Sequence, residues 1–247
     1  MSKTAIVIPA RWGSTRFPGK ALHPILGKPL VQHTWERCMK AKGASLVVVA
    51  TDDMRIAEAA FAFGAEVTLT SPDHPTGTDR IAEVAERLRG YNSIINVQGD
   101  EPAVEPKLID KLIATMQEHP KAEMVTAASP FEDEQDALNP NNVKVVAAID
   151  GRALYFSRSL IPFNRDGGKA IAPLWHIGIY GYRRSFLKEF VRWKPTPLEE
   201  SEKLEQLRAL EHGATIHVVK TKHHGLGVDT PEDVARAEAA LSAKKRI

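Results

Sequence analysis

The chain has 247 residues, and its 33 Lys and Arg against 31 Asp and Glu give a formal net charge of +2. This length suits one large α/β domain, alone or with a sizeable insertion, and is enough to bury a core. The near balance of charge argues against a general nucleic-acid-binding protein, which would carry a marked basic excess. Any strongly positive site must therefore be local.

Composition also bears on redox chemistry and membranes. Cys38 is the single cysteine, so neither an internal disulfide nor a cysteine-based zinc site is available, and its helical surroundings predict a buried thiol. The N-terminus does not combine a basic stretch, an apolar core and a small-residue cleavage site. Apolar runs stay well below the ~20 residues that cross a bilayer. The simplest expectation is a cytoplasmic protein without membrane insertion.

Short β-like runs alternate with amphipathic helical windows over the first half of the chain. The pattern predicts strands at 4–9, 45–50, 66–70, 93–97 and 123–128, and helices at 30–42, 54–63, 79–89 and 107–118. Apolar strands that alternate with helices are typical of a mostly parallel sheet covered on both faces. We therefore expect a Rossmann-like α/β fold, with the whole of 1–247 forming one domain.

The pattern changes near residue 128. Two strands, 143–149 and 153–157, are predicted to turn at Asp150-Gly151, and 174–182 is another β-rich run. Residues 130–185 thus form a β-rich elaboration. Helices are then predicted at 185–191, 199–211 and 231–241, the last starting from an N-cap and proline at Thr230-Pro231.

The stretch IPARWGSTRFPGK, residues 8–20, follows the first predicted strand. Ligands of open parallel sheets bind beyond the carboxyl ends of the strands, and glycine-rich loops present backbone N–H groups to anions. Arg11, Arg16 and Lys20 add positive charge, so the loop predicts a polyphosphate cradle. The glycine spacing and Ala21 after the lysine differ from a P-loop, and the G-x-G-x-x-G dinucleotide pattern is absent. Taken alone, the stretch also fits an ordinary solvated turn.

The loop resembles the nucleotide-binding signature of the sugar nucleotidyltransferases, most closely of the cytidylyltransferases that activate acidic sugars. Seven further motifs occur in the order expected for that family. They are ATDD (50–53), HPTGTDR (74–80), NVQGDEP (96–102), ALYFSRSLIPFNR (153–165), HIGIYGY (176–182), LEQLRALEHG (204–213) and VDTPED (228–233). The resemblance covers about residues 4–241, and the ordered set is far more specific than any one motif.

This resemblance implies transfer of CMP from CTP to the anomeric hydroxyl of 3-deoxy-D-manno-octulosonate (Kdo), with release of pyrophosphate, for lipopolysaccharide assembly. Such a reaction requires alignment and neutralisation of charge more than covalent chemistry by the protein. Arg11, Arg16 and Lys20 are expected to act on the triphosphate, and the resemblance places Arg16 and Lys20 nearest to it. It also implies a homodimer that makes contact through the β-rich elaboration.

Two aspartates are candidates for a Mg²⁺ site. Asp100 follows the apolar strand at 93–97, and Asp229 precedes the last helix. The resemblance assigns both to Mg²⁺, which usually takes one or two protein carboxylates. Without the resemblance, Asp100 is also consistent with a turn residue, and Asp229 with a carboxylate that interacts with the helix dipole. His223 and His224 are adjacent in sequence, so we do not expect them to share an ion.

The remaining candidates are expected to recognise the two substrates. Cytosine requires an acceptor for its amine and a donor for its carbonyl. The nucleotide-binding candidates are Pro9, Ala10, Ser14, Thr76, Gly77, Arg80 and Gln98, of which the resemblance assigns the last four. The sugar-binding candidates are Arg165 for the carboxylate and His176, Glu205 and Gln206 for hydroxyls. As alternatives, Arg80 pairs with Asp79 or Glu83 on its own helix, His176 is structural, and the last two are solvated helix residues.

Other functions remain open at this point. The 8-amino analogue of Kdo differs by one group, so a local change of pocket would accommodate it. Sialic-acid enzymes usually carry a different loop, which makes that substrate less favoured. A nucleotide-binding regulator without turnover need not keep Lys20 together with Asp100 and Asp229. A Rossmann oxidoreductase lacks support from the glycine pattern.

Overall fold

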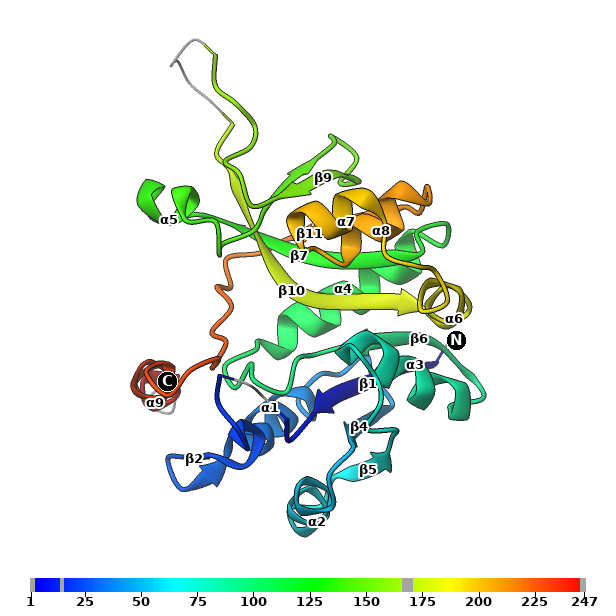
Figure 1. Ribbon diagram of the computed structural model, residues 1–247, viewed down its shortest axis with the longest axis vertical. Helices are drawn as coiled ribbons and strands as arrows, with labels where there is room; N and C mark the ends of the chain where they lie inside the picture. The colour runs from blue at the N-terminus through cyan, green and yellow to red at the C-terminus, as the bar shows by residue number, and fades with distance from the viewer. Residues whose placement is uncertain (1–2, 14–15, 166–170, 245–247) are drawn as a thin grey trace.

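A mixed nine-stranded sheet forms the centre of the described chain (Figure 1), which in this computed structural model comprises residues 3–13, 16–165 and 171–244. From one edge to the other the strands are β11 (Ile216–Lys220), β7 (Met124–Pro130), β10 (Leu174–Arg183), β6 (Tyr91–Asn96), β1 (Lys3–Ala10), β4 (Leu46–Thr51) and β5 (Glu66–Leu69). Strand β8 (Lys144–Ala147) pairs with β10 and with β9 (Ala153–Ser157). The five strands predicted in the first half are all present, with ends shifted by one or two residues.

The sheet is mostly parallel, as predicted. Strands β6, β1, β4 and β5 run parallel, β11 is parallel to β7, and β10 lies antiparallel between β6 and β7. From β1 the chain moves to β4 on one side and later to β6 on the other. Such a reversal of strand order opens a crevice beyond the carboxyl ends of the two neighbouring strands. The loops after β1 and β6 therefore face the same crevice.

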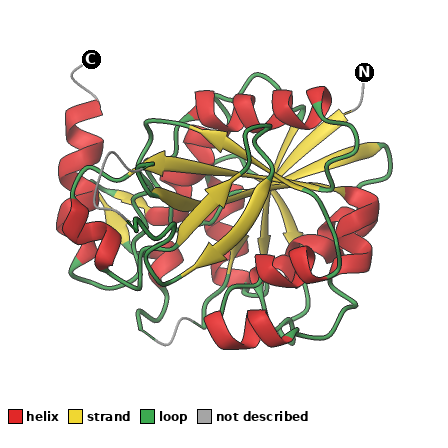
Figure 2. Cartoon of the chain, turned by 90° about the horizontal axis from the view of Figure 1, so that it is seen from above, coloured by secondary structure: helices red, strands yellow, loops and turns green. Residues whose placement is uncertain are grey.

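Helices cover both faces of the sheet (Figure 2) because the strands alternate their apolar side chains. On one face, Ile6 and Ile8 of β1 pack in a core cluster with three helices; on the other, Ala5 and Val7 belong to a second cluster. The first face carries α1 (Leu30–Cys38), α2 (Met54–Ala62) and α4 (Pro106–Glu118). The second carries α3 (Gly77–Arg87), α6 (Arg184–Phe190) and α8 (Gln206–Glu211). Cys38 is buried, as expected.

A third, smaller cluster joins the two ends of the chain. Helix α9 (Asp233–Lys244) packs through Ala237 and Leu241 against Ile25 and Leu30. These partners come from the hairpin of β2 (Pro24–Ile25) and β3 (Lys28–Pro29) and from the start of α1. This contact brings the segment before α9 next to η1 (Lys20–Leu22), and so places the VDTPED motif beside the opening loop.

Residues 130–185, predicted as a β-rich elaboration, contain β8, β9 and β10, of which β10 is a central strand of the sheet. Strands β8 and β9 are antiparallel, and Gly151 in their turn has a φ of +87°, which glycine adopts without strain. Between β9 and β10, residues 158–165 and 171–173 form a segment that extends away from the sheet (Figure 1). We call this segment the arm. Helix α5 (Glu134–Leu138) lies near its base.

Several predicted elements differ in the structure. The helix predicted at 199–211 is two helices, α7 (Pro197–Glu202) and α8, because Lys203 adopts a left-handed conformation with φ of +53° and ends α7. The predicted start of the last helix at Thr230-Pro231 was wrong. Helix α9 begins at Asp233, whose carboxylate accepts hydrogen bonds from the backbone N–H groups of Asp229 and Thr230.

Strand β11, the β2–β3 hairpin and α5 were not predicted. The hairpin strands and α5 are two to five residues long, too short for a periodic pattern to stand out. None of the helices in the described part of the chain combines the length and the apolar character needed to span a bilayer.

Candidate active site

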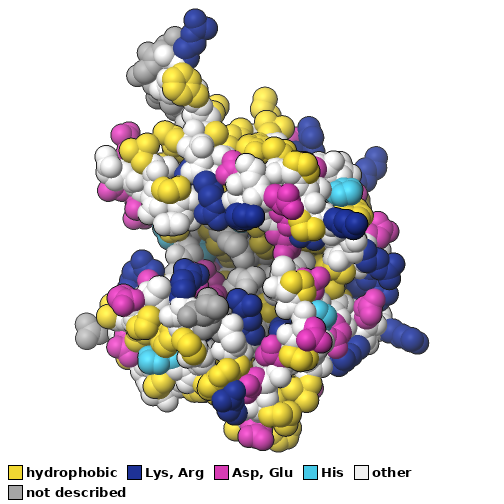
Figure 3. Space-filling view, viewed as in Figure 1, with side chains coloured by type: hydrophobic (Ala, Val, Ile, Leu, Met, Phe, Trp, Pro, Cys, Tyr) yellow, Lys and Arg dark blue, Asp and Glu magenta, His cyan; other side chains and the backbone are white. Residues whose placement is uncertain are grey.

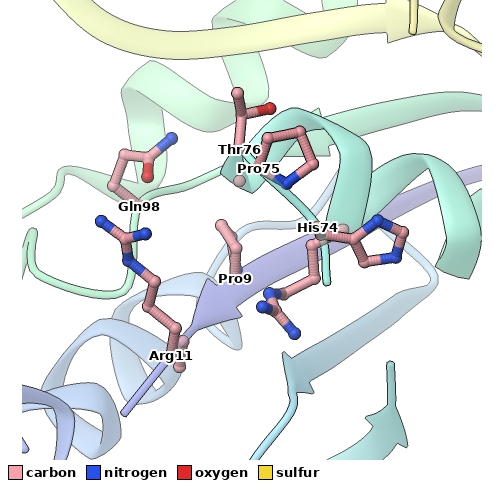
Figure 4. Close-up of a pocket in the computed structure, with 9 residues that line it drawn as sticks. Pro9, Arg11, His74, Pro75, Thr76 and Gln98 are labelled. Atoms are coloured by element: carbon pink, nitrogen blue, oxygen red, sulfur yellow. The ribbon is translucent and has the colours of Figure 1, made fainter. Parts of the chain in front are cut away.

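A cavity of about 170 Å³ opens beyond the carboxyl end of β1, between the start of α3 and the loop after β6. Its lining residues are Pro9, Ala10, Arg11, His74, Pro75, Thr76, Gly77, Arg80 and Gln98. Every described residue predicted to bind the nucleotide is in this set, and the remaining candidate, Ser14, lies outside the described residues. Figure 4 shows the Arg11 guanidinium and the Gln98 amide on the same side of the cavity.

The wall opposite Pro9 is the N-terminus of α3. Thr76 caps this helix: its hydroxyl accepts from the Asp79 N–H, while the Asp79 carboxylate accepts from the Thr76 N–H at 3.2 Å. This reciprocal capping fixes the entry of the chain into the helix. Gly77 follows, and a side chain at this position would project toward Pro9 and Gln98. Small residues at the start of α3 therefore keep the cavity open.

Arg80 is 3% exposed, and two residues outside the cavity lining hold its side chain in place. Its guanidinium donates to Asp52 Oδ2 at 2.7 Å and to the hydroxyl of Thr70. The alternative in which Arg80 pairs with Asp79 or Glu83 was wrong, because the side chain turns toward the ends of β4 and β5. Sequence reasoning quoted the ATDD motif but missed Asp52 as the partner. A second Asp52 oxygen, Oδ1, is buried without a hydrogen bond.

A second hollow adjoins the first through Pro9, Ala10 and Arg11, and is otherwise lined by Lys20, Ala21, Leu30, Gly99 and Asp100. Its back wall is tight: a Cβ at Gly99 would lie 2.8 Å from the carbonyl oxygen of Pro9. The glycine thus permits close approach of the β6 loop to the end of β1. Lys and Arg side chains gather around the opening of the crevice in Figure 3.

Four charged side chains from three distant segments meet at this second hollow. Lys20 Nζ lies 2.5 Å from Asp100 Oδ2 and 3.1 Å from Asp229 Oδ1, and it also donates to the Val228 carbonyl at 3.2 Å. Arg16 Nη2 lies 3.1 Å from the same Asp229 oxygen. A backbone hydrogen bond from Val228 N–H to the Asp100 carbonyl joins the two acidic loops directly.

The electrostatics of this cluster follow from that geometry. Burial alone would lower the pKa of Lys20, but the carboxylates of Asp100 and Asp229 outweigh it and hold that pKa above its usual value. Glu101, the residue after Asp100, accepts from the Leu226 N–H at 2.9 Å. Burial, with Asp100 and Asp229 nearby, raises the pKa of Glu101 to about 7. Through this hydrogen bond, Glu101 thus stabilises the loop that precedes Asp229.

The two aspartates suit a Mg²⁺ ion. Both carboxylates contact the Lys20 ammonium, so one oxygen of each faces a common point beside the second hollow. Hard oxygen donors, one or two from protein with the rest from phosphates and water, are the set that Mg²⁺ prefers. Within the described ranges, no group of three or more His, Cys, Asp or Glu side chains could hold a metal ion. His223 and His224 contact different carboxylates, those of Glu105 and Glu132.

Three of the four sugar-binding candidates are part of a buried polar region behind the start of α3. Glu205 immediately precedes α8 and forms a hydrogen bond with Thr78, while burial raises its pKa. Gln206 is 5% exposed, and its amide nitrogen has no hydrogen-bond partner. Both residues are therefore largely enclosed by the protein, and the alternative that they are solvated helix residues was wrong. An unpaired buried donor is costly, which makes Gln206 suited to a ligand oxygen.

His176 is held inside the same region. Its Nε2 lies 3.0 Å from the Thr126 hydroxyl, and its ring packs edge-on against Phe156 and 5.4 Å from that of Tyr180. Burial lowers the pKa of His176 to about 3, so the ring is neutral. Tyr180 was not singled out from the sequence, although it lies in the HIGIYGY motif; burial and nearby Glu205 raise its pKa.

The structure does not bring Arg165 into either hollow. This residue is exposed and belongs to the arm, which leads away from the sheet (Figure 1). The lining of both cavities comes instead from the ends of β1 and β6, from η1, and from the start of α3. A role of Arg165 in sugar binding thus stays a prediction.

Comparisons with known proteins identify the family of this chain. The family model for cytidylyltransferases matches residues 5–216. A 3-deoxy-manno-octulosonate cytidylyltransferase of Geobacter sulfurreducens is 54% identical over 96% of this chain and 98% of its own length. The Pseudomonas syringae pv. tomato protein of the same name is 51% identical, with coverage of 96% and 98%. The chain therefore belongs to the cytidylyltransferase family.

Solved structures place it more narrowly. The structure of a CMP:2-keto-3-deoxy-manno-octonic acid synthetase complexed with CTP superimposes with a TM-score of 0.94, at 40% identity, over 98% of this chain and 100% of that one. A cytidylyltransferase of Leptospira borgpetersenii has a TM-score of 0.67 at 19% identity, covers 98% and 88%, and shares the fold. Within the family, the chain thus groups with the 3-deoxy-manno-octulosonate cytidylyltransferases.

Proposed function

We propose that this protein transfers CMP from CTP to the anomeric hydroxyl of Kdo, giving CMP-Kdo and pyrophosphate for lipopolysaccharide synthesis. The observation that supports this most directly is the cluster of Arg16, Lys20, Asp100 and Asp229 at the second hollow, which adjoins the cavity lined by the candidate nucleotide residues. The names and the CTP complex of the similar proteins support the same reaction.

In this proposal, the role of each candidate residue follows from the hollow that it lines. Cytosine and ribose enter the cavity between Pro9 and Thr76, where Gln98 and the buried Arg80 offer hydrogen-bonding groups. The triphosphate then extends over the second hollow toward Lys20. The sugar hydroxyl oxygen forms a bond to the α-phosphorus and its proton passes to solvent water, while the bond from the α-phosphorus to the oxygen that bridges it to the β-phosphorus breaks and that oxygen leaves with pyrophosphate.

Catalysis in this arrangement is mainly positioning and neutralisation of charge. Arg11, Arg16 and Lys20 offset the negative charge of the triphosphate and of the leaving pyrophosphate. Asp100 and Asp229 would hold Mg²⁺, which supplies further neutralisation of phosphate charge when it is bound. With the metal and nucleotide present, Lys20 can exchange its carboxylate partners for phosphate oxygens, because its ammonium donors rotate freely.

Kdo is proposed to bind next to the buried polar region of His176, Glu205 and Gln206. The neutral His176 and the unpaired Gln206 amide can donate to sugar hydroxyls, and Glu205 can accept from them. The 8-amino analogue remains the second candidate, since Glu205 near the sugar would also suit an ammonium group.

We also propose a homodimer and a cytoplasmic location. Around the base of the arm, four large apolar side chains are exposed: Leu138, Leu160, Phe163 and Ile171. They line a hollow of about 400 Å³, and Phe163 is 88% exposed. A patch of this kind marks an interaction site more often than a free surface, and a second copy of this chain is the proposed occupant. Use of CTP favours the cytoplasm.

The function is tested by a panel in which each nucleoside triphosphate is combined with Kdo, its 8-amino analogue or sialic acid. Pyrophosphate release is followed with and without Mg²⁺. The proposal expects turnover with CTP and Kdo only in the presence of the metal. Faster turnover with the amino analogue would favour the second candidate, and CTP binding without turnover would favour a regulator.

A further inference from the structure

The indole of Trp12 is held between a cation and a glycine at the base of the opening loop. The guanidinium carbon of Arg55 lies 3.4 Å from the ring centroid. On the loop side, Gly19 lies so close that a Cβ there would be 3.0 Å from Cη2 of the indole. Gly19 also has a φ of +70°, so a side chain at this position would be strained by its backbone as well.

The cation is fixed independently of the loop. Arg55 belongs to the first turn of α2 and makes two hydrogen bonds to Asp53, from Nε at 2.9 Å and from Nη2 at 2.6 Å. Asp53 is the N-cap of α2 and accepts from the backbone N–H of Arg55 as well. The guanidinium therefore presents its flat face from a rigid helix end, the arrangement that favours a cation–π contact.

Trp12 also lies at the point where the two ends of the opening loop meet. The backbone N–H of Gly19 donates to the carbonyl of Trp12 at 3.1 Å, so the two residues that pack together also join the ends of the loop. Arg16 lies inside this closed segment, and Lys20 follows Gly19 directly. A change in the position of the Trp12 ring would therefore move both cations that meet Asp229.

We propose that Trp12, clamped by Arg55, is a positioning residue that sets the place of the cationic loop before CTP binds. This inference rests on the proposed function. Arg16 and Lys20 converge on one Asp229 oxygen, and the Trp12 contact fixes the base of the loop that carries both. Misplacement of reacting groups by about 1 Å can cost about 10²-fold in rate, and a smaller side chain at residue 12 would allow such movement.

The test compares Trp12→Ala with Trp12→Phe, and uses Phe61→Ala on the exposed side of α2 as the matched control. We expect W12A to reduce kcat/KM for CTP by about 10- to 100-fold and to weaken CTP binding measured by calorimetry without sugar. The KM for Kdo should change less than about twofold, and W12F, which keeps a flat ring, should recover most of the loss. F61A should match the wild type.

A second pair of variants tests the clamp itself. Arg55→Gln removes the cation over the ring and should lower kcat/KM for CTP by about two- to fivefold. Arg152→Gln is its control, because Arg152 makes the same contact with the aspartate two residues before it, Asp150. If thermal unfolding shows that W12A is not folded, the comparison of R55Q with R152Q tests the positioning role in its place.

Equal effects of W12A and F61A, or equal changes in the KM values of both substrates, would overturn the positioning role. The positioning role would also be overturned if R55Q and R152Q had the same kcat/KM for CTP. Wild-type turnover in the same assay tests the proposed function separately. A wild type without turnover refutes that function, whereas an active wild type with a normal W12A refutes only the inference on Trp12.

Discussion

The ammonium of Lys20 lies 2.5 Å from the carboxylate of Asp100, although 80 residues separate them in sequence. The ion pair joins the loop after β1 to the loop after β6, and these are the two loops that the reversal of strand order brings to one crevice. The same ammonium contacts Asp229, from the segment before α9. Lys20 thus forms ion pairs with both proposed metal ligands.

Asp100→Asn is expected to abolish nearly all metal-dependent turnover while the fold remains. The amide keeps the shape and can still accept from Lys20, but it removes the charge that is proposed to hold Mg²⁺, so we expect a loss of about 10³-fold. Pyrophosphate release measures the activity, and circular dichroism checks the fold. Asp136→Asn, at an exposed position on α5, is the control. Near-normal activity of D100N would disprove the metal assignment.

Much of this site could be predicted because its signals are local. Arg16, Lys20 and Asp100 each follow an apolar strand, and the carboxyl ends of parallel strands share one edge of a sheet. The resemblance added Asp229, whose proximity depends on the packing of α9 against Ile25 and Leu30. No local pattern reveals that contact.

What the sequence did not reveal depends on tertiary packing. Arg80 was compared with neighbours on its own helix, whereas the structure pairs it with Asp52 across the sheet edge. Glu205 and Gln206 have the pattern of solvated helix residues, but Lys203 interrupts the helix and turns them inward. The clamp joins Trp12 to Arg55, 43 positions further along the chain, which periodicity cannot detect.

Gln206→Leu is expected to raise the KM for Kdo about five- to tenfold while the KM for CTP changes little. The buried amide nitrogen has no hydrogen-bond partner among the described residues, so a sugar hydroxyl is its proposed acceptor, and loss of one such hydrogen bond reduces binding by about 1–1.5 kcal/mol. Gln135→Leu, on exposed α5, is the matched control. Steady-state kinetics with each substrate varied in turn provide the measurement.

Arg165→Ala belongs in the same experiment. A specific rise in the KM for Kdo would support the prediction that Arg165 binds the sugar carboxylate, and since this residue is on the arm, it would also require the arm to reach a sugar site. Unchanged kinetics for R165A beside an impaired Q206L would place sugar recognition in the buried polar region alone.

Phe163→Asp is expected to convert the proposed dimer into monomers. Phe163 is 88% exposed at the apolar hollow under the arm, and a carboxylate there could not be buried against a second copy without a large desolvation cost. Light scattering after size-exclusion chromatography measures the mass of about 27 kDa per chain. Phe61→Asp, exposed on α2, should leave the mass unchanged. A wild type that is already monomeric would rule out the self-interface.

His176 predicts a specific dependence of stability on pH. Burial lowers its pKa to about 3 from 6.5, so between these values the unfolded chain binds more protons than the folded one. The free energy of unfolding therefore falls as pH falls below 6.5, by up to about 1.4 kcal/mol per pH unit from this residue. Burial of Glu101 acts in the opposite direction, since its pKa is raised, and stability from that group falls as pH rises toward 7.

Comparison with His176→Gln isolates the histidine, because Glu101 is common to both proteins. Urea unfolding of the metal-free proteins at pH 7.0 and 5.0 should show that the wild type loses about 2 kcal/mol more than H176Q. Proton NMR of the His176 ring provides a direct check, with no titration expected above pH 5. Parallel stability curves, or a ring that titrates near pH 6, would mean that His176 is open to solvent and not enclosed by Thr126 and Phe156.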